Sequence, residues 1–232
     1  MFQRIAISAL IAGILGGLFV TALQGIAVTP LILEAETYEG AADAGHDHDA
    51  ATAEAGHDHD AEAWAPADGL ERTAWTGAAN VVTGVGFALL LGAGFALSGR
   101  RVDWRRGLLW GAAGFAAFAL APAFGLPPEV PGMHAAPLAD RQLWWLATVA
   151  ASAGGLALLA FAPRVAWKGV GVLLLIVPHL VGAPQPDEHG GLAPAELSHA
   201  FVFASLATSA AFWLALGAIA GLVFDRLGRR EA

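Results

Sequence analysis

The sequence predicts an all-α, multi-pass membrane protein with six transmembrane helices arranged as three helical hairpins. Charged residues make up 14% of the 232 residues, whereas a soluble domain carries about 25%. The apolar residues fall in runs that approach or exceed the roughly 20 residues needed to cross a bilayer. Most Lys and Arg residues lie in short turns between these runs. We therefore treat residues 1–232 as one membrane domain.

Six apolar segments are expected to span the membrane: 2–28, 73–98, 107–126, 142–161, 169–183 and 199–224. The first exceeds the 7–15 apolar residues of a secretory signal, and no clear small-x-small cleavage site follows it, so we expect a retained helix. An acidic, His-rich loop, residues 34–72, is inserted between the first two spans.

The basic residues set the expected orientation. Because positive charge stays inside, ten of the twelve Lys and Arg indicate cytoplasmic turns and two cytoplasmic termini; the ten are Arg4, Arg100, Arg101, Arg105, Arg106, Arg164, Lys168, Arg226, Arg229 and Arg230. All eight His and most of the acids then lie outside or near the outer ends of spans. A negative outer face concentrates cations.

The three hairpins are expected from a faint internal repeat. Pro122 precedes Asp140 by 18 residues, and Pro178 precedes Glu196 by the same interval. Parallel repeats about an axis along the membrane normal occur in transporters. The alternative is that proline–glycine patterns recur by chance in such a composition.

The most conspicuous motif is a doubled HDHD in the first outer loop. Imidazole and carboxylate groups both bind divalent metals, and short His-rich tracts are read as metal-binding on composition. We expect weak, exchangeable metal binding, since the fixed spacing of a structural zinc site is missing; the alternative is a solvated acidic linker. The candidate ligands are His46, Asp47, His48, Asp49, His57, Asp58, His59 and Asp60.

A second candidate lies within the fifth span, where Pro178 precedes His179. Proline removes a helix hydrogen bond and frees the carbonyl of Leu174, four residues back. A short, Pro-interrupted span and an ionisable residue within it both point to a transport site. The alternative is a kinked helix whose histidine bonds a neighbouring helix.

Further candidates lie at the outer rim. Glu196 and His199 are three residues apart and share a helix face, and His189 lies in the loop before them. Each is also explained as a solvated loop residue or a helix-terminal charge. Other polar residues that are candidates for lining the same vestibule are Gln24, Glu34, Glu36, Asn80, His134, Asp140, Asp187 and Glu188.

The remaining features indicate architecture. Tryptophans near span ends, including Trp144, are typical of an interfacial belt, and Gly84, Gly86, Gly92, Gly94, Gly154 and Gly155 favour close helix packing. The sequence has no phosphate-binding loop, nucleophile elbow or HExxH motif, so we expect no enzyme activity. The short basic turns do not form a nucleic-acid surface.

Five stretches resemble the CbtA family of bacterial cobalt transporter subunits. They cover residues 1–39, 71–91, 120–133 (LAPAFGLPPEVPGM), 141–161 and 178–186 (PHLVGAPQP). The resemblance implies a bacterial cytoplasmic (inner) membrane protein for cobalt uptake, linked to cobalamin synthesis. It also implies a partner, CbtB, a small single-span subunit with its own His-rich segment.

The predicted function is therefore uptake of a divalent transition-metal cation, Co²⁺ first and Ni²⁺ second, with no tightly bound cofactor. The outer loop captures the ion, which passes to a site near His179. One alternative is a non-transporting metal sensor or buffer. Another is a membrane redox subunit with His179 and His199 as haem ligands, which predicts a coloured protein.

Overall fold

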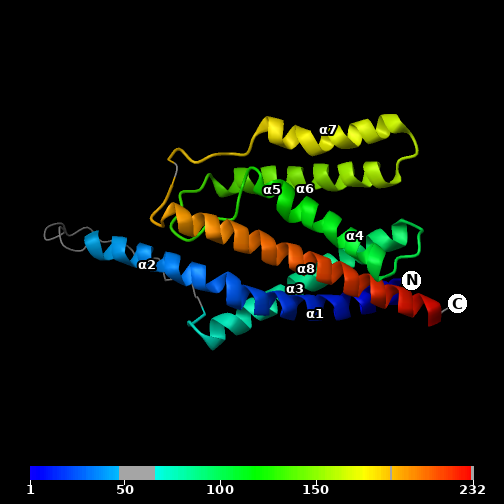
Figure 1. The fold of residues 1–232 in the computed structure, drawn as a ribbon, viewed down its shortest axis with the longest axis horizontal. Coiled ribbons are helices and arrows are strands. Elements are labelled where there is room, and N and C mark those ends of the chain that lie inside the picture. The colour runs from blue at the N-terminus through cyan, green and yellow to red at the C-terminus, as the bar shows by residue number, and fades with distance from the viewer. Residues whose placement is uncertain (47–65, 189, 231–232) are drawn as a thin grey trace.

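The computed structural model describes residues 1–46, 66–188 and 190–230, and these residues are almost entirely helical (Figure 1). Four helices are long and apolar enough to cross a membrane: α1 (Phe2–Ala27), α3 (Leu70–Leu97), α6 (Leu138–Phe161) and α8 (Ala195–Arg230). The apolar helix α7 (Val165–Val181) is shorter, about 26 Å at 1.5 Å per residue. The remaining elements are α2 (Thr29–His46), α4 (Trp104–Phe115), the π-helical turn η1 (Ala116–Leu120) and α5 (Ala121–Ala123).

Each of the six apolar segments is largely helical in the structure, with helix ends within six residues of those expected. The third segment is one continuous run through α4, η1 and α5 that ends at Ala123, before the prolines at 127 and 128. The expected loop 34–72 begins as helix α2, because Pro30 suits a first helical turn and the following Ala- and Glu-rich residues favour helix. Helix α2 continues the direction of α1 beyond the ends of its neighbours (Figure 1).

The most extensive packing is of α1 with α3, α4 with α8, α1 with α8, and α6 with α7. The third span with the fourth, and the fifth with the sixth, are not the main packing pairs; the three-hairpin topology stays a prediction. Glycines provide the physical reason: Gly107 and Gly111 on α4 meet Gly217 on α8 backbone to backbone. Such small-residue contacts let membrane helices approach closely, and they decide which helices pair.

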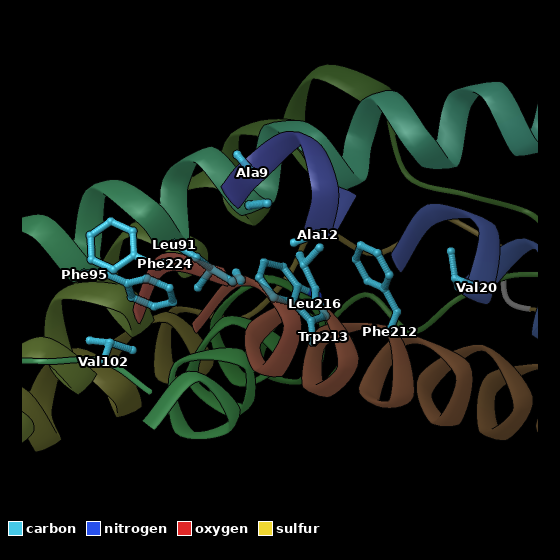
Figure 2. Close-up of a cluster of buried hydrophobic side chains, with 12 residues drawn as sticks. Ala9, Ala12, Val20, Leu91, Phe95, Val102, Phe212, Trp213, Leu216 and Phe224 are labelled. Atoms are coloured by element: carbon cyan, nitrogen blue, oxygen red, sulfur yellow. The ribbon is translucent and has the colours of Figure 1, made fainter. Parts of the chain in front are cut away.

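The largest buried cluster joins α1, α3 and α8 (Figure 2). Phe95 and Leu216 are almost fully buried there. The Trp213 ring stacks on Phe118 of η1 with centroids 5.4 Å apart and also contacts Phe87. This cluster fixes α4 and η1 on α8, and η1 forms one wall of the cavity described below.

Both termini and the basic 98–103 turn lie at one end of the molecule (Figure 1). Arg4 Nε donates to the carbonyl of Phe224 at 2.6 Å. Arg101 Nε donates to Asp225 at 2.7 Å, and this hydrogen bond raises the pKa of the Arg101 guanidinium. The predicted cytoplasmic charges thus gather at a single end.

The opposite end carries two loops, 124–137 and 182–194, joined by an antiparallel bridge between Met133 and Gly191. The two basic residues predicted at this end are both ion-paired. Arg72 bonds Glu36 and Asp68, and Arg141 bonds Glu129 at 2.9 Å. Their charge is balanced locally, so the acidic character of this end is preserved.

Candidate functional site

A cavity of about 900 Å³ lies near the loop-bearing end, between α6, α7 and the η1–α5 segment. Its wall includes His179, the ionisable residue that the sequence places within the fifth span. The side chains around it are mostly apolar. The lining residues are Ala116, Leu120, Ala121, Phe124, Gly125, Trp144, Ser152, Leu156, Leu175, His179, Gly182, Ala183 and Gln185.

Irregular backbone surrounds this cavity on two sides. On α7, Pro178 lies inside the last helical turn, and Gly182 ends the helix with φ +83°. On the facing wall, the chain widens into the π turn η1 just before Pro122. Prolines remove helix hydrogen bonds, and π turns are frequent at functional sites. The proline next to His179 therefore has a second backbone irregularity opposite it; a kink in α7 itself stays a prediction.

Helices α6 and α7 contact each other beside the cavity through a pair of glycines. A Cβ on Gly155 would lie 2.6 Å from the carbonyl oxygen of Gly171, and a Cβ on Gly171 would lie 2.8 Å from the carbonyl oxygen of Gly155. His179 is two turns along α7 from Gly171. The distance between His179 and the α6 wall therefore depends on this contact.

His179 itself is exposed and contacts two aromatic rings edge-on. Its ring centroid is 5.9 Å from that of Phe124 and 6.2 Å from that of Trp144. The lining residues include no carboxylate. The cavity therefore offers a metal ion one imidazole and, at Gln185, one side-chain amide.

Three polar atoms on one face of α6 are buried without a hydrogen-bond partner in the described part of the chain: Trp144 Nε1, Thr148 Oγ1 and Ser152 Oγ. Such a group costs about 1–3 kcal/mol when left unpaired. Trp144 and Ser152 both line the cavity. The expectation that Trp144 belongs to an interfacial belt is wrong, because its side chain is buried. Thr148 and Ser152 were not among the residues expected at the site.

The outer-rim residues form no compact ligand set. Glu196 and His199 lie on the first turns of α8 and are exposed, as is His134. Among residues 1–46, 66–188 and 190–230, no group of three His, Cys, Asp or Glu could hold a metal ion. Joint binding by Glu196 and His199 stays a prediction.

Three of the expected vestibule residues, Gln24, Glu36 and Asn80, have structural partners instead. The Asn80 side chain donates to Thr21 Oγ1 at 3.0 Å and to Gln24 Oε1 at 2.7 Å, which ties α3 to α1. Glu36 accepts from Arg72 and fixes α2 beside the start of α3.

The doubled HDHD motif begins at the end of α2. His46 is the last residue of α2. The other candidates, Asp47, His48, Asp49, His57, Asp58, His59 and Asp60, together with His189, lie outside the described residues. Their role in metal capture stays a prediction.

The comparison with protein families decides the family. Residues 2–225 match the model described as "Probable cobalt transporter subunit (CbtA)". The chain belongs to the CbtA family. The predicted resemblance is confirmed over nearly the whole chain. No curated protein and no solved structure matches it.

Membership of the CbtA family, together with four long apolar helices, makes the chain a multi-pass membrane protein of cobalt transport. A transporter subunit implies a non-enzymatic role and the presence of partners. Cobalt is accordingly the transported substrate.

Proposed function

We propose that this CbtA-family chain carries Co²⁺ inward across the bilayer and that the ion enters through the cavity beside His179. The observation that carries the proposal is an imidazole in a cavity between apolar helices, in a chain of a cobalt transporter family. Imidazole is a good ligand for first-row divalent metals. Ni²⁺ is the second candidate substrate.

The charge distribution supports entry from the loop-bearing end. The basic residues gather at the end that carries the termini (Figure 1), which the positive-inside rule assigns to the cytoplasm. An inside-negative potential then favours cation entry by about 2.3 kcal/mol per charge per 100 mV. With no ATP-binding motif in the chain, this potential, an ion gradient or a partner such as CbtB supplies the energy.

The HDHD segment is proposed to collect the metal. It follows His46 at the far end of α2, which extends beyond the ends of the neighbouring helices (Figure 1). In this scheme the segment raises the local metal concentration, and the cavity passes the ion onward. The sensor or buffer alternative instead assigns the whole function to the segment.

The test is uptake of radioactive cobalt by cells that express the chain with and without CbtB. His179→Phe removes the imidazole and keeps an aromatic ring against Phe124 and Trp144, so uptake should be lost while the protein is retained. His134→Ala is the matched control, because His134 is an exposed loop histidine. Deletion of residues 47–60 should raise the cobalt concentration needed without abolishing uptake. If no form of the chain accumulates cobalt even with CbtB, and deletion of residues 47–60 alone abolishes cobalt binding to the membranes, the sensor or buffer reading is correct.

A further inference from the structure

Thr148 and Ser152, the two hydroxyl residues of α6, differ from three other hydroxyl residues of the described helices. Thr21, Thr208 and Ser8 each donate to a carbonyl of their own helix, at 2.7, 2.8 and 3.0 Å. Thr148 and Ser152 are as deeply buried as Ser8, with relative exposures of 0% and 1%, yet their hydroxyl oxygens have no partner in the described residues. The usual way of satisfying a helical hydroxyl is therefore not used on α6.

The two hydroxyls lie in a row with the indole N–H of Trp144. Trp144, Thr148 and Ser152 are four residues apart, so they lie on one face of the helix. The first and the last of them line the cavity of about 900 Å³ that His179 also lines. Buried polar groups in native proteins are almost always bonded to protein or to ordered water. Bound water needs space and polar partners; the cavity supplies the space, and the row beside it supplies the partners, although Thr148 does not itself line the cavity.

The chemistry of the row also fits a hydrated cation better than a bare one. A hydroxyl oxygen accepts a hydrogen bond from a water molecule bound to a metal, whereas an indole N–H only donates and cannot bind the metal. The cavity lining offers one imidazole and no carboxylate. Divalent metals take four to six ligands, so an ion held by this imidazole, even with the Gln185 amide, keeps water among its ligands.

We propose that Thr148 and Ser152 form, with His179, a site for a hydrated divalent cation. His179 is the direct protein ligand, the two hydroxyls accept hydrogen bonds from metal-bound waters, and Trp144 Nε1 donates to a further water. This assignment rests on the proposed transport function for the identity of the ion. The presence of water along α6 does not depend on it.

The water is tested first, by thiol accessibility. The chain contains no cysteine, so a single introduced cysteine is the only thiol that can react. Thr148→Cys and Ser152→Cys are made singly in the full chain. Permeabilised membranes, in which the reagent reaches both faces of the bilayer, are treated with a charged, water-soluble thiol reagent. Ser8→Cys is the control, because Ser8 is equally buried but bonded within its helix.

We expect Ser152→Cys to react at least tenfold faster than Ser8→Cys, and we expect added Co²⁺ to slow its reaction. Equal rates at the two positions would overturn the proposal, whatever the transport assays show. Rapid labelling without protection by Co²⁺ would overturn the cation site.

Transport separates this inference from the proposed function. Ser152→Ala and Thr148→Val remove the hydroxyls and keep most of the side-chain volume, and together they should raise the half-saturating cobalt concentration severalfold. Ser8→Ala should leave it unchanged. If wild type accumulates cobalt and the double variant does so with the same half-saturation, the hydroxyl site is wrong and the transport function stands. If wild type accumulates no cobalt even with CbtB, the transport function is wrong. The labelling experiment then still shows whether water reaches α6.

Discussion

Gly107 of α4 and Gly217 of α8 lie backbone against backbone. A Cβ added to either residue would overlap the carbonyl oxygen of the other. One turn along, Gly111 meets Gly217, and Gly221 meets Gly107, so the contact continues along both helices. This contact pairs the third apolar segment with the sixth.

Gly217→Ala should therefore destabilise the protein. The atoms that the new methyl group would meet are backbone atoms of α4, which cannot move aside as a flexible side chain does. Overpacking of this kind costs about 1–3 kcal/mol. The measurement is thermal unfolding in detergent.

Gly86→Ala is the matched control, because Gly86 is also helical and has nothing within 4 Å of an added Cβ. It should be neutral or slightly stabilising, since alanine favours helix over glycine by about 1 kcal/mol. Equal effects of the two substitutions would contradict the close contact between α4 and α8.

Asp225 is predicted to stabilise the end of the molecule that carries both termini, by joining α8 to the 98–103 turn. Its carboxylate is buried, with a side-chain exposure of 8%, and it accepts from Arg101 at 2.7 Å and from Arg229 at 2.6 Å. In Asp225→Asn the amide NH₂ would face an arginine donor. We expect the free energy of unfolding to fall by about 1–2 kcal/mol. The effect is smaller than for a fully buried ion pair because both arginines are largely exposed.

Thermal unfolding again measures this effect, and Asp187→Asn, in the exposed loop after α7, is the control. High salt should lower the stability of wild type more than that of Asp225→Asn. No difference between the two variants would show that the ion pairs contribute nothing.

The helices could be predicted from the sequence because length and apolarity are local properties. Their pairing could be predicted only for α1 with α3, because the other pairs depend on which glycine surfaces meet across the fold. Gly84, Gly92, Gly94 and Gly155 are closely packed as predicted, whereas Gly154 has only an ordinary contact and Gly86 has open space. The contact between Gly107 and Gly217 joins residues far apart in the chain and leaves no local signal.

His179 could be found from the sequence because a Pro-His pair in an apolar run is conspicuous. Thr148 and Ser152 were missed, because a hydroxyl in a membrane helix ordinarily bonds its own backbone. The available signal was the four-residue spacing of Trp144, Thr148 and Ser152. That spacing becomes informative only when the atoms are seen to lack partners.

Gly155→Ala should impair both folding and transport, because it separates α6 from α7. The added methyl group would meet the carbonyl oxygen of Gly171 at 2.6 Å, and a shift of α7 would move His179 away from the α6 hydroxyls. We expect a stability loss of about 1–3 kcal/mol and at least a tenfold drop in cobalt uptake at limiting metal.

Gly169→Ala, on the same helix pair with nothing within 4 Å of the added Cβ, should leave both quantities near wild type. Uptake per folded protein, measured beside thermal unfolding, separates the two effects. Normal uptake by a folded Gly155→Ala variant would show that the spacing of α6 and α7 does not control the site.

Competition between metals tests which atoms bind the ion. If one imidazole is the direct ligand and water supplies the rest, the site has little geometry with which to distinguish Co²⁺ from Ni²⁺. Nitrogen ligands bind Ni²⁺ more tightly than Co²⁺, so Ni²⁺ should halve cobalt uptake at an equal or lower concentration. Mg²⁺ prefers oxygen ligands, and a hundredfold excess should have little effect. The measurement is radioactive cobalt uptake at fixed cobalt with increasing unlabelled competitor. Inhibition by Mg²⁺ as strong as that by Ni²⁺ would mean that only oxygen atoms bind the ion and that His179 is not its ligand.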